Sequence, residues 1–314
     1  MVYWKHMSEI VATIDIWTRE ILEKTAQYFA EQQHTAWLVG GSVRNVLLGE
    51  PETDWDIAIA GNAANTSHLA RHLADQLGGH YAYMHEKASR VVVKRQMREI
   101  TLDIAPLQGE TIETDLRTRD FTLNAIALPL PQLLTALAQQ LPIATSAYID
   151  PLRGVVDAQA RIVRAADSAI FRHDPLRLLR AVRFSTCYQL TIDPKTEMLM
   201  RRDAALLFQA APERIHEELY TILAPPGATQ CLRYLDSLGL FTTLIPEFIP
   251  ARGMPQPELH HWDVFEHSIE AVAALERLAT TLAQSPEIIR CSPLETPEGD
   301  LVVLHDLLAE AEQQ

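Results

Sequence analysis

Residues 38–60, LVGGSVRNVLLGEPETDWDIAIA, constrain the fold of this chain more than any other segment. The segment begins with a strand-like apolar run that ends at Gly40 and Gly41, followed by Ser42 and Arg44. Two glycines between a strand and a helix satisfy a steric need by themselves, because a tight turn needs small residues. The backbone N–H groups that open the following helix, with the Ser42 hydroxyl and the Arg44 guanidinium, also favour a phosphate-bearing ligand. Neither interpretation excludes the other.

The second half of the segment carries two carboxylates, Asp54 and Asp56, at the start of an alternating apolar strand. Side chains two positions apart on a strand point to the same face, so both can bind one hard divalent ion. An isolated Asp-x-Asp is more often an exposed turn. A third acid, Asp103, lies in another strand-like run and would complete a site for two Mg²⁺ ions if the two strands are neighbours. The segment therefore predicts Mg²⁺-dependent chemistry on a nucleoside triphosphate.

Composition indicates an ordinary globular protein: 314 residues, 47% hydrophobic and 22% charged. Since no apolar run approaches the roughly 20 residues of a spanning helix and the N-terminus lacks a secretion signal, we expect a cytoplasmic protein without membrane contact. Cys187, Cys231 and Cys291 lack the paired spacing of a zinc site or a disulfide framework. We expect all three to be packing residues or incidental.

The formal net charge of −14 argues against a nucleic-acid partner until its distribution is considered. Residues 150–220 hold ten arginines and one lysine against ten acids, a balance of +1, whereas residues 251–314 hold three arginines against twelve acids, a balance of −9. We therefore expect a polyanion to meet the middle of the chain and to avoid its end.

Hydrophobic periodicity predicts an α+β fold for residues 1–150. Apolar residues recur every three or four positions over 8–32 and 65–77, which favours helices, and Gly78 and Gly79 close the second. The predicted strands are 37–39, 54–60, 80–84, 89–94, 99–105 and the run FTLNAIALPL, which ends at Pro129 and Pro131.

From residue 151 onward the pattern becomes helical. The predicted helices are 174–188, 194–207, 212–223 and 230–238. Pro225, Pro226 and Gly227 break the pattern between the last two. We expect three parts: a mixed α+β part over 1–150 and helical parts over 151–225 and 226–314.

Five motifs follow one another in an order that resembles class II tRNA nucleotidyltransferases, the CCA-adding enzymes and their bacterial poly(A) polymerase relatives. They are GGSVRN, DWDIAI, RDFTLNAIAL (119–128), DPLRLLRAVRF (174–184) and ERIHEE (213–218). The resemblance covers roughly residues 25–240. It implies a nucleotidyltransferase head with a mixed sheet, followed by an all-α neck and body. The implied activity is Mg²⁺-dependent transfer of CMP or AMP from CTP or ATP to the 3′ end of tRNA, releasing pyrophosphate. The implied partner is the tRNA 3′ end and acceptor arm, and no DNA is expected.

The resemblance also implies roles for single residues in the head. Asp54 and Asp56 match the metal-binding pair, and Asp103 matches the third catalytic carboxylate. Gly41 and Arg44 match positions near the triphosphate, and Gly40 and Ser42 lie in the same predicted nucleotide-binding turn. Arg119, Asp120 and Asn124 match a motif that grips the sugar and phosphate end of the nucleotide. Without the flanking motifs, a solvent-facing salt bridge would be the preferred interpretation of Arg119 and Asp120.

The segment 174–184 allows two interpretations. Asp174 before Pro175 is a natural helix N-cap, and Arg177, Arg180 and Arg183, spaced by three, suit the wet face of an amphipathic helix. By resemblance, Asp174 and Arg177 read the incoming base, and the later two arginines add nucleotide contacts. Cytosine and adenine both present an amino donor beside a ring-nitrogen acceptor. A carboxylate and a guanidinium can therefore satisfy both and reject uracil and guanine.

The motif ERIHEE is expected to position rather than catalyse. Glu213 and Glu217, four apart on a proline-initiated helix, can simply face water or pair with Arg214.

Three departures limit the resemblance. Asn45 replaces the usual acid, His173 replaces the usual Glu, and the stretch 103–119 lacks the longer loop typical of enzymes that add the whole CCA. The short stretch resembles relatives that add only two cytidines. CCA, CC, A and poly(A) addition all remain open.

The end of the chain carries an alternative from another class. Residues 259–272 resemble the opening of an HD phosphohydrolase domain, in which His305 and Asp306 would supply a metal-binding pair. The preferred interpretation places His260, His261 and His267 on a helix of an incomplete domain. On that interpretation we expect this chain to be a fragment of a longer enzyme. A nucleotide-binding or RNA-binding module without catalysis would require a missing metal ligand, and none is obviously missing.

Overall fold

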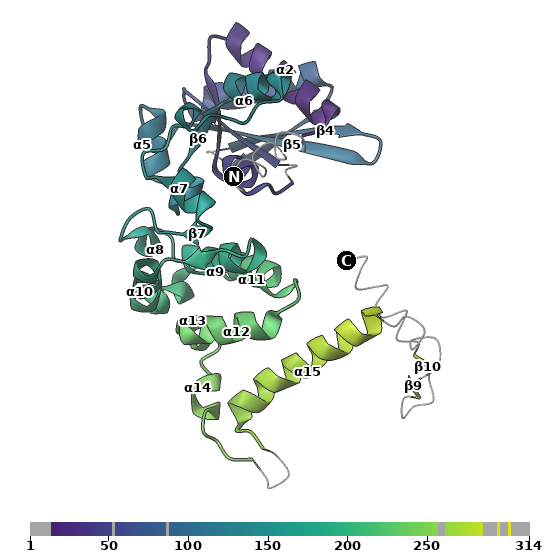
Figure 1. Ribbon diagram of the computed structural model, residues 1–314, viewed down its shortest axis with the longest axis vertical. Coiled ribbons are helices and arrows are strands. Elements are labelled where there is room, and N and C mark those ends of the chain that lie inside the picture. The colour runs from purple at the N-terminus through teal and green to yellow at the C-terminus, as the bar shows by residue number, and fades with distance from the viewer. Residues whose placement is uncertain are drawn as a thin grey trace. The chain divides into compact units, whose positions relative to one another are not determined.

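The computed structural model describes residues 14–51, 54–85, 88–256, 261–284, 294–295 and 301–302. They fall into two compact units (Figure 1). The first comprises Met1–Arg177 with Tyr188–Met200, and the second comprises Leu178–Cys187 with Arg201–Gln314. The predicted boundaries at residues 150 and 225 stay a prediction. No helix in the described ranges combines the length and apolar character needed to cross a membrane.

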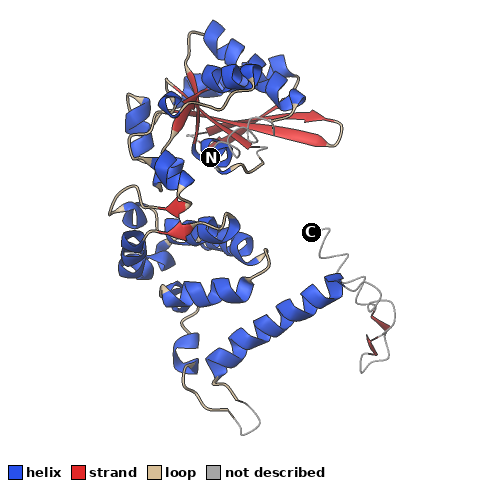
Figure 2. Cartoon of the chain, viewed as in Figure 1, coloured by secondary structure: helices blue, strands red, loops and turns tan. Residues whose placement is uncertain are grey.

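The first unit is built on a six-stranded mixed sheet (Figure 2). Its strands are β1 (Ala36–Val39), β2 (Asp54–Ile59), β3 (His80–His85), β4 (Ala88–Arg95), β5 (Arg98–Pro106) and β6 (Ala127–Pro129). They lie in the order β3-β4-β5-β2-β1-β6, with β2 parallel to β5 and the other neighbours antiparallel. The predicted α+β fold with a mixed sheet is confirmed.

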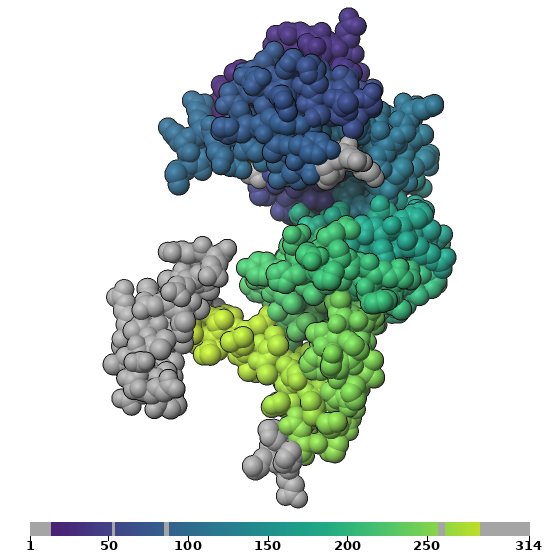
Figure 3. Space-filling model, turned by 180° about the vertical axis from the view of Figure 1, so that it is seen from behind, coloured from purple at the N-terminus to yellow at the C-terminus, as the bar shows by residue number. Residues whose placement is uncertain are grey.

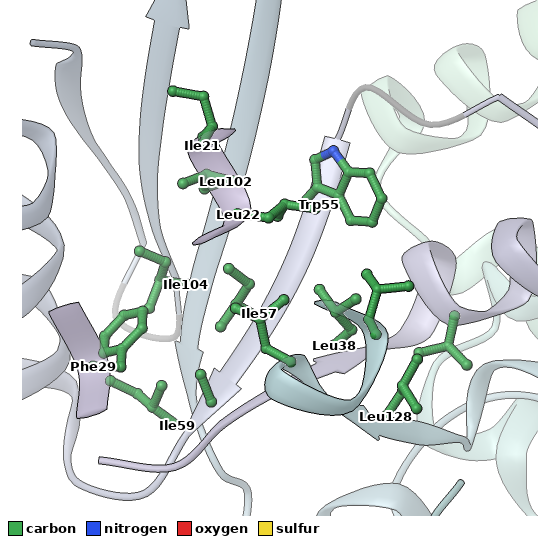
Figure 4. Close-up of a cluster of buried hydrophobic side chains, with 14 of the residues drawn as sticks. Ile21, Leu22, Phe29, Leu38, Trp55, Ile57, Ile59, Leu102, Ile104 and Leu128 are labelled. Carbon is green, nitrogen blue, oxygen red and sulfur yellow. The ribbon is translucent and has the colours of Figure 1, made fainter. Parts of the chain in front are cut away.

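One face of this sheet carries the main hydrophobic core. Because side chains alternate along a strand, Trp55, Ile57 and Ile59 of β2 lie on one face with Leu102 and Ile104 of β5 (Figure 4). Three helices supply the other side of this core: α2 (Ile16–Glu31), α4 (Ala63–Leu77) and α6 (Leu130–Gln139). Figure 3 shows the outer surface of this part from behind, coloured purple to blue.

The alternate positions of the same strands face the opposite side. Ala58 of β2 packs there in a smaller cluster with Ile112 and Leu116 of α5 (Ile112–Arg117). Asp54 and Asp56 have the same parity as Ala58, so they share its face rather than that of the core. The helix α3 (Gly40–Leu48) follows β1 directly. The apolar alternation in β2 and β5 therefore sets the direction of the carboxylates.

The run FTLNAIALPL was predicted as one strand, and that prediction is wrong over its first half. Residues Thr122–Asn124 form a 3₁₀ turn (η1), β6 is confined to Ala127–Pro129, and α6 begins at Leu130. Asp120 is the cause: its carboxylate accepts the N–H of Phe121 and the amide of Asn124, both at 2.8–2.9 Å. Local side-chain bonds of this kind compete with strand pairing.

The helix predicted over 174–188 is observed as α9 (Arg177–Cys187), which begins three residues later than predicted. A separate short helix, α8 (Ile170–His173), precedes it and ends at Asp174. Pro175 explains the break, because the residue before a proline is driven to extended angles, and Asp174 has φ −148° and ψ 103°. Its carboxylate still accepts the N–H of Leu176 at 3.1 Å, so part of the predicted capping role remains.

The rest of the described chain is mostly helical, as predicted. Its helices are α7 (Gly154–Gln159), α10 (Pro194–Asp203), α11 (Pro212–Leu223), α12 (Ala228–Ser237), α13 (Leu240–Leu244), α14 (Phe248–Ala251) and α15 (Val264–Gln284). A short parallel pair, β7 (Ile162–Val163) with β8 (Thr191–Ile192), was not predicted.

Two further predictions fall partly outside the described residues. The helix predicted over 8–32 is observed from Ile16, and residues 8–13 lie outside the described ranges. Of the cysteines, Cys231 is buried and Cys187 is exposed, while Cys291 lies outside.

Candidate active site

The predicted glycine turn lies directly against the carboxylate strand. Gly40, at φ +59°, opens α3, and a Cβ placed there would lie 2.8 Å from Nη1 of Arg119 and 3.1 Å from Oδ2 of Asp56. The N–H of Gly41 donates to the same Asp56 oxygen at 3.0 Å. Positive φ and a crowded Cβ position both require glycine at residue 40. The backbone of the glycine turn therefore holds the carboxylate of Asp56 in place.

Ser42 joins α3 to β2. Its hydroxyl accepts the N–H of Asp56 at 2.6 Å and lies 3.2 Å from the carbonyl oxygen of Asp54, to which it donates. The side chain has 0% exposure. Ser42 thus fixes the backbone of both carboxylates, and its predicted contact with a phosphate stays a prediction.

The third predicted carboxylate lies beside the first pair. In the parallel pairing of β2 and β5, Asp56 is the register partner of Asp103, and across the next strand Asp103 is the partner of Arg90. Arg90 donates from Nε and Nη2 to the two oxygens of Asp103, each at 2.7 Å. The exposed Asp54 precedes Asp56 by two residues on the same face. A row of three charged side chains therefore crosses three strands, with Asp103 between the positive charge of Arg90 and the negative charge of Asp56.

Burial raises the pKa of Asp56 above its usual value. The Arg119 and Arg44 guanidinium groups and the Gly41 N–H favour the charged form, whereas the neighbouring charge of Asp103 opposes it. The net direction is upward, because desolvation is the largest effect. An additional cation at Asp56 would favour its ionised form.

Asp54 and Asp56 fit a hard divalent ion through their chemistry. Both supply carboxylate oxygens from one face of a strand, the ligand type that Mg²⁺ prefers. Within the described ranges, no three side chains of His, Cys, Asp and Glu are grouped so as to hold a metal ion. Asp103 instead gives both oxygens to Arg90.

Arg44 is buried, with 6% exposure, and is held by three side chains. It donates to Oδ1 of Asn45 at 2.9 and 3.1 Å, to Oδ1 of Asn124 at 2.9 Å and to the hydroxyl of Tyr188 at 3.0 Å. Its guanidinium carbon lies 4.6 Å from the centre of the Tyr188 ring. Asn45, the departure from the usual acid, thus still serves as an acceptor for Arg44.

The motif from Arg119 to Asn124 is held by neighbouring side chains. Arg119 donates from Nε and Nη2 to Oδ2 of Asp115 at 3.1 and 2.9 Å. Asn124 lies between Arg44 and Asp120, accepting from the first and donating to the second. The predicted triphosphate residues and the predicted sugar-binding residues therefore form one connected group.

The predicted base-reading pair lies close to this group. Arg177 donates from Nη2 to the carbonyl oxygen of Thr118 at 3.4 Å, and Thr118 adjoins Arg119. Asp174 and Arg177 are both half-buried. Most predicted site residues thus belong to the first unit: Gly40, Gly41, Ser42, Arg44, Asp54, Asp56, Asp103, Arg119, Asp120, Asn124, Asp174 and Arg177.

Arg180 and Arg183 belong to the second unit, where both lie near Glu218. Arg183 pairs with Glu218 at 2.8 Å and Arg180 at 3.9 Å. Glu218 ends the ERIHEE motif, whose Glu213 and Glu217 are exposed. The contact between this motif and the arginines of α9 therefore comes from Glu218, which the sequence analysis did not single out, and the positioning role of the motif stays a prediction.

Sequence reasoning also missed Arg90, Asp115 and Tyr188. Arg90 would have required the register of the hairpin formed by β4 and β5, because its partner lies on the neighbouring strand. Asp115 carried a usable signal, since it precedes Arg119 by four residues, a spacing that favours an ion pair on one helical turn.

The phosphohydrolase alternative gains no support from the described residues. His261 is exposed and lies beside Trp262, and His267 is half-buried on α15. His260, His305 and Asp306 lie outside the described ranges.

Two families match the chain by sequence. The "Poly A polymerase head domain" matches residues 36–164, and the "Probable RNA and SrmB- binding site of polymerase A" matches residues 189–252. An A-adding tRNA nucleotidyltransferase of Deinococcus radiodurans is 36% identical over 264 residues, covering 82% of this chain and 55% of the relative. A CC-adding tRNA nucleotidyltransferase of Geobacter sulfurreducens is 34% identical over 205 residues, covering 65% and 44%.

A solved structure agrees with these matches. The CCA-adding enzyme of Thermotoga maritima, complexed with tRNA, has a TM-score of 0.64 and 25% identity, covering 79% of this chain and 56% of that chain. The chain spans about half the length of the curated relatives it matches. The glycine turn and the carboxylate strand lie within the first family match, and the helices α10 to α14 lie within the second. Residues 36–164 and 189–252 thus match the head domain and the RNA-binding region of poly(A) polymerases, and most of the chain is similar to tRNA nucleotidyltransferases.

Proposed function

We propose that this chain transfers CMP, AMP or both from CTP or ATP to the 3′ end of a tRNA, without a nucleic-acid template and with release of pyrophosphate. The observation that carries the proposal is the carboxylate strand held against a glycine turn, with Gly41 donating to Asp56 at 3.0 Å and Arg119 beside both. The A-adding and CC-adding activities named for two relatives support the same reaction.

Asp54 and Asp56 are the proposed ligands of Mg²⁺, with Asp103 as the third carboxylate of a two-ion site. Mg²⁺ bound there would neutralise triphosphate charge and make the attacking 3′ hydroxyl more acidic. Ser42 and the Gly41 N–H hold Asp56 in place, so the carboxylate needs little reorganisation. Arg90 neutralises Asp103 in the structure described above.

Arg119 is the proposed direct contact for the triphosphate, because its side chain is partly exposed and lies at the glycine turn. Arg44 is proposed to act on the same phosphates through its charge, since its guanidinium is buried. Asp120 and Asn124 hold this part of the site together and are proposed to lie against the sugar. A planar guanidinium suits phosphate oxygens because it donates two parallel hydrogen bonds.

Asp174 and Arg177 are the proposed protein template for the base. A carboxylate accepts from the amino group that cytosine and adenine share, and a guanidinium donates to the ring nitrogen beside it. Arg180 and Arg183 are proposed as additional nucleotide contacts on α9. A wrong base would leave buried polar groups unpaired, at a cost of about 1–3 kcal/mol each.

The proposed tRNA surface lies in the middle of the chain. Residues 189–252 match an RNA-binding region, and residues 150–220 carry the positive charge balance noted above. We propose a catalytic head over 1–150, a neck over 151–225 and a body over 226–314, acting in the cytoplasm on the 3′ end and acceptor arm.

The test uses Mg²⁺ and three transcripts of one tRNA, ending before the CCA, after the first C and after the second C. Each is incubated with one labelled nucleoside triphosphate at a time. We expect incorporation of CTP, ATP or both, and none of UTP or GTP. Asp54→Ala and Asp56→Ala should abolish it, whereas Asp75→Ala, at an exposed acid on α4, should not.

The same assay separates the remaining activities. Growth by one A on the third transcript indicates A addition, growth by two C on the first indicates CC addition, and long A tails on unrelated RNA indicate poly(A) polymerase activity. The absence of incorporation on every RNA, with full activity in an authentic tRNA nucleotidyltransferase run in parallel, would contradict the proposal.

A further inference from the structure

Asp115 is a buried carboxylate whose two oxygens are both engaged. It lies on α5 with 3% exposure. Oδ2 accepts from Nε and Nη2 of Arg119 at 3.1 and 2.9 Å, and Oδ1 accepts the backbone N–H of Gln108 at 2.8 Å. A carboxylate is buried at low cost only when it is paired and hydrogen-bonded, and Asp115 meets both conditions.

This contact determines which edge of Arg119 stays available. Nε and Nη2 face Asp115, so Nη1 projects from the remaining corner of the planar guanidinium. Nη1 lies 2.8 Å from the place where a Cβ on Gly40 would be, next to Oδ2 of Asp56. The missing side chain at Gly40 thus provides the space that Arg119 occupies.

Asp115 also connects Arg119 to the strand of the third carboxylate. The Gln108 N–H that it accepts belongs to the segment just after β5, the strand that carries Asp103. The helix α5 between them begins with a capping box formed by Thr111 and Thr114. Such reciprocal capping fixes the first turn of a helix. The short stretch 103–119 is therefore an ordered support for Arg119.

We propose that Asp115 is a positioning residue for nucleotide binding: it orients Arg119 so that Nη1 faces the triphosphate of the incoming CTP or ATP at the turn of Gly40 and Asp56. This inference rests on the proposed function. An unrestrained arginine has many rotamers, and ordering it before the nucleotide arrives lowers the entropy lost on binding. Loss of Asp115 should therefore weaken binding of the nucleotide far more than binding of the RNA.

The test is a double-mutant cycle between Asp115→Asn and Arg119→Lys, with kcat and KM measured separately for the nucleotide and for the tRNA. Asn keeps the size of the side chain and can accept from Gln108, but it removes the charge that holds Arg119. The control is Glu113→Gln, which neutralises an exposed carboxylate on the same helix.

We expect Asp115→Asn to raise the nucleotide KM roughly 10- to 100-fold, the range of a lost hydrogen bond to a charged group. The KM for tRNA should stay within about twofold, and Glu113→Gln should resemble wild type. The double variant should be no worse than Arg119→Lys alone, because residues in direct contact act non-additively.

Two results would overturn the inference. One is a full additive loss in the double variant, and the other is a fall in kcat with both KM values unchanged, which indicates a smaller folded fraction. If Asp115→Asn does not fold, Asp115→Glu replaces it in the cycle. The Glu variant keeps the negative charge but displaces it by one methylene, so the same rise in the nucleotide KM is expected. If the wild-type protein itself incorporated no nucleotide into any RNA, that result would instead contradict the proposed function.

Discussion

Arg90 and Asp103 face each other across β4 and β5, and the guanidinium contacts both carboxylate oxygens at 2.7 Å. The opposing charges are partly shielded from water, with 35% and 21% of the two side chains exposed. Arg90 therefore competes with any cation for Asp103, and removal of Arg90 should leave that carboxylate available.

We expect Arg90→Ala to bind Mn²⁺, a spectroscopic substitute for Mg²⁺, roughly 2- to 5-fold more tightly than wild type. Such a factor corresponds to less than about 1 kcal/mol, the energy of a partly exposed ion pair. Electron paramagnetic resonance of free Mn²⁺, without nucleotide, measures the affinity directly. The control is Lys94→Ala, which breaks the Lys94–Glu99 pair on the same two strands. Equal affinities in the two variants would show that Arg90 does not restrain Asp103.

Gly40→Ala should abolish nucleotide transfer while leaving the chain folded. The new Cβ would meet Nη1 of Arg119 at 2.8 Å and Oδ2 of Asp56 at 3.1 Å, so both groups would have to move. Gly78→Ala is the matched control: its φ of +65° is similar, and nothing lies within 4 Å of the new Cβ.

Both alanine variants should lose about 1–2 kcal/mol of unfolding free energy, because both force alanine into a left-handed conformation. Urea unfolding gives this loss, and labelled CTP or ATP gives the activity. Similar activities in Gly40→Ala and Gly78→Ala would mean that the crowding at Gly40 is unimportant.

Arg177→Ala should relax the choice of base. Loss of the guanidinium removes the donor to the ring nitrogen of cytosine or adenine, so UTP and GTP should gain roughly tenfold relative to CTP and ATP. Competition between labelled nucleotides on one tRNA transcript measures the ratio. Arg172→Ala, at an exposed arginine on α8, should keep the wild-type ratio. Retention of full selectivity by Arg177→Ala would refute the template role.

Asp15 should make stability depend on pH. Hydrogen bonding to Arg98 lowers the pKa of Asp15 below its usual value, and the N–H groups of Trp17 and Thr18 also donate to this N-cap of α2. A lowered folded-state pKa contributes stability that is fully present above the unfolded value of about 3.9 and is lost as pH falls toward the folded value.

Asp15→Asn keeps the cap but removes the charge, so we expect its deficit relative to wild type to shrink below about pH 4. Asp15→Ala also loses the cap, at a further cost of about 1 kcal/mol at every pH. Unfolding in urea at pH 7, 4 and 3 measures both. A deficit in Asp15→Asn that is constant over this range would contradict the assignment.

Much of the sheet was predictable, because period-two alternation directly reports which face of a strand is buried. Asp54 and Asp56 were predicted to share a face on this ground, and Asp103 was predicted to join them if its strand is a neighbour. The strands β2 and β5 are neighbours and place Asp56 and Asp103 in register. Alternation alone does not give the register, and Arg90 was missed for that reason. The predicted strands 89–94 and 99–105 follow each other closely and favour a hairpin, but only the exact pairing places Arg90 opposite Asp103.

Single side chains changed the backbone path in two places. Asp120 binds Phe121 and Asn124 and turns the chain where apolar content predicted a strand. Pro175 delays the start of the helix predicted over 174–188 to Arg177, the first residue of α9. Propensity averaged over a window cannot detect such effects.

The parallel pairing of β2 with β5 has a consequence for how the protein acquires its activity. A parallel neighbour requires a long crossover, and here α4, β3 and β4 all intervene between the strands of Asp56 and Asp103. Pairings between distant parts of a chain form slowly, because closing the intervening loop reduces chain entropy. During synthesis the two carboxylates cannot meet until β5 has left the ribosome, so metal-dependent activity should appear late in folding, after the local helices.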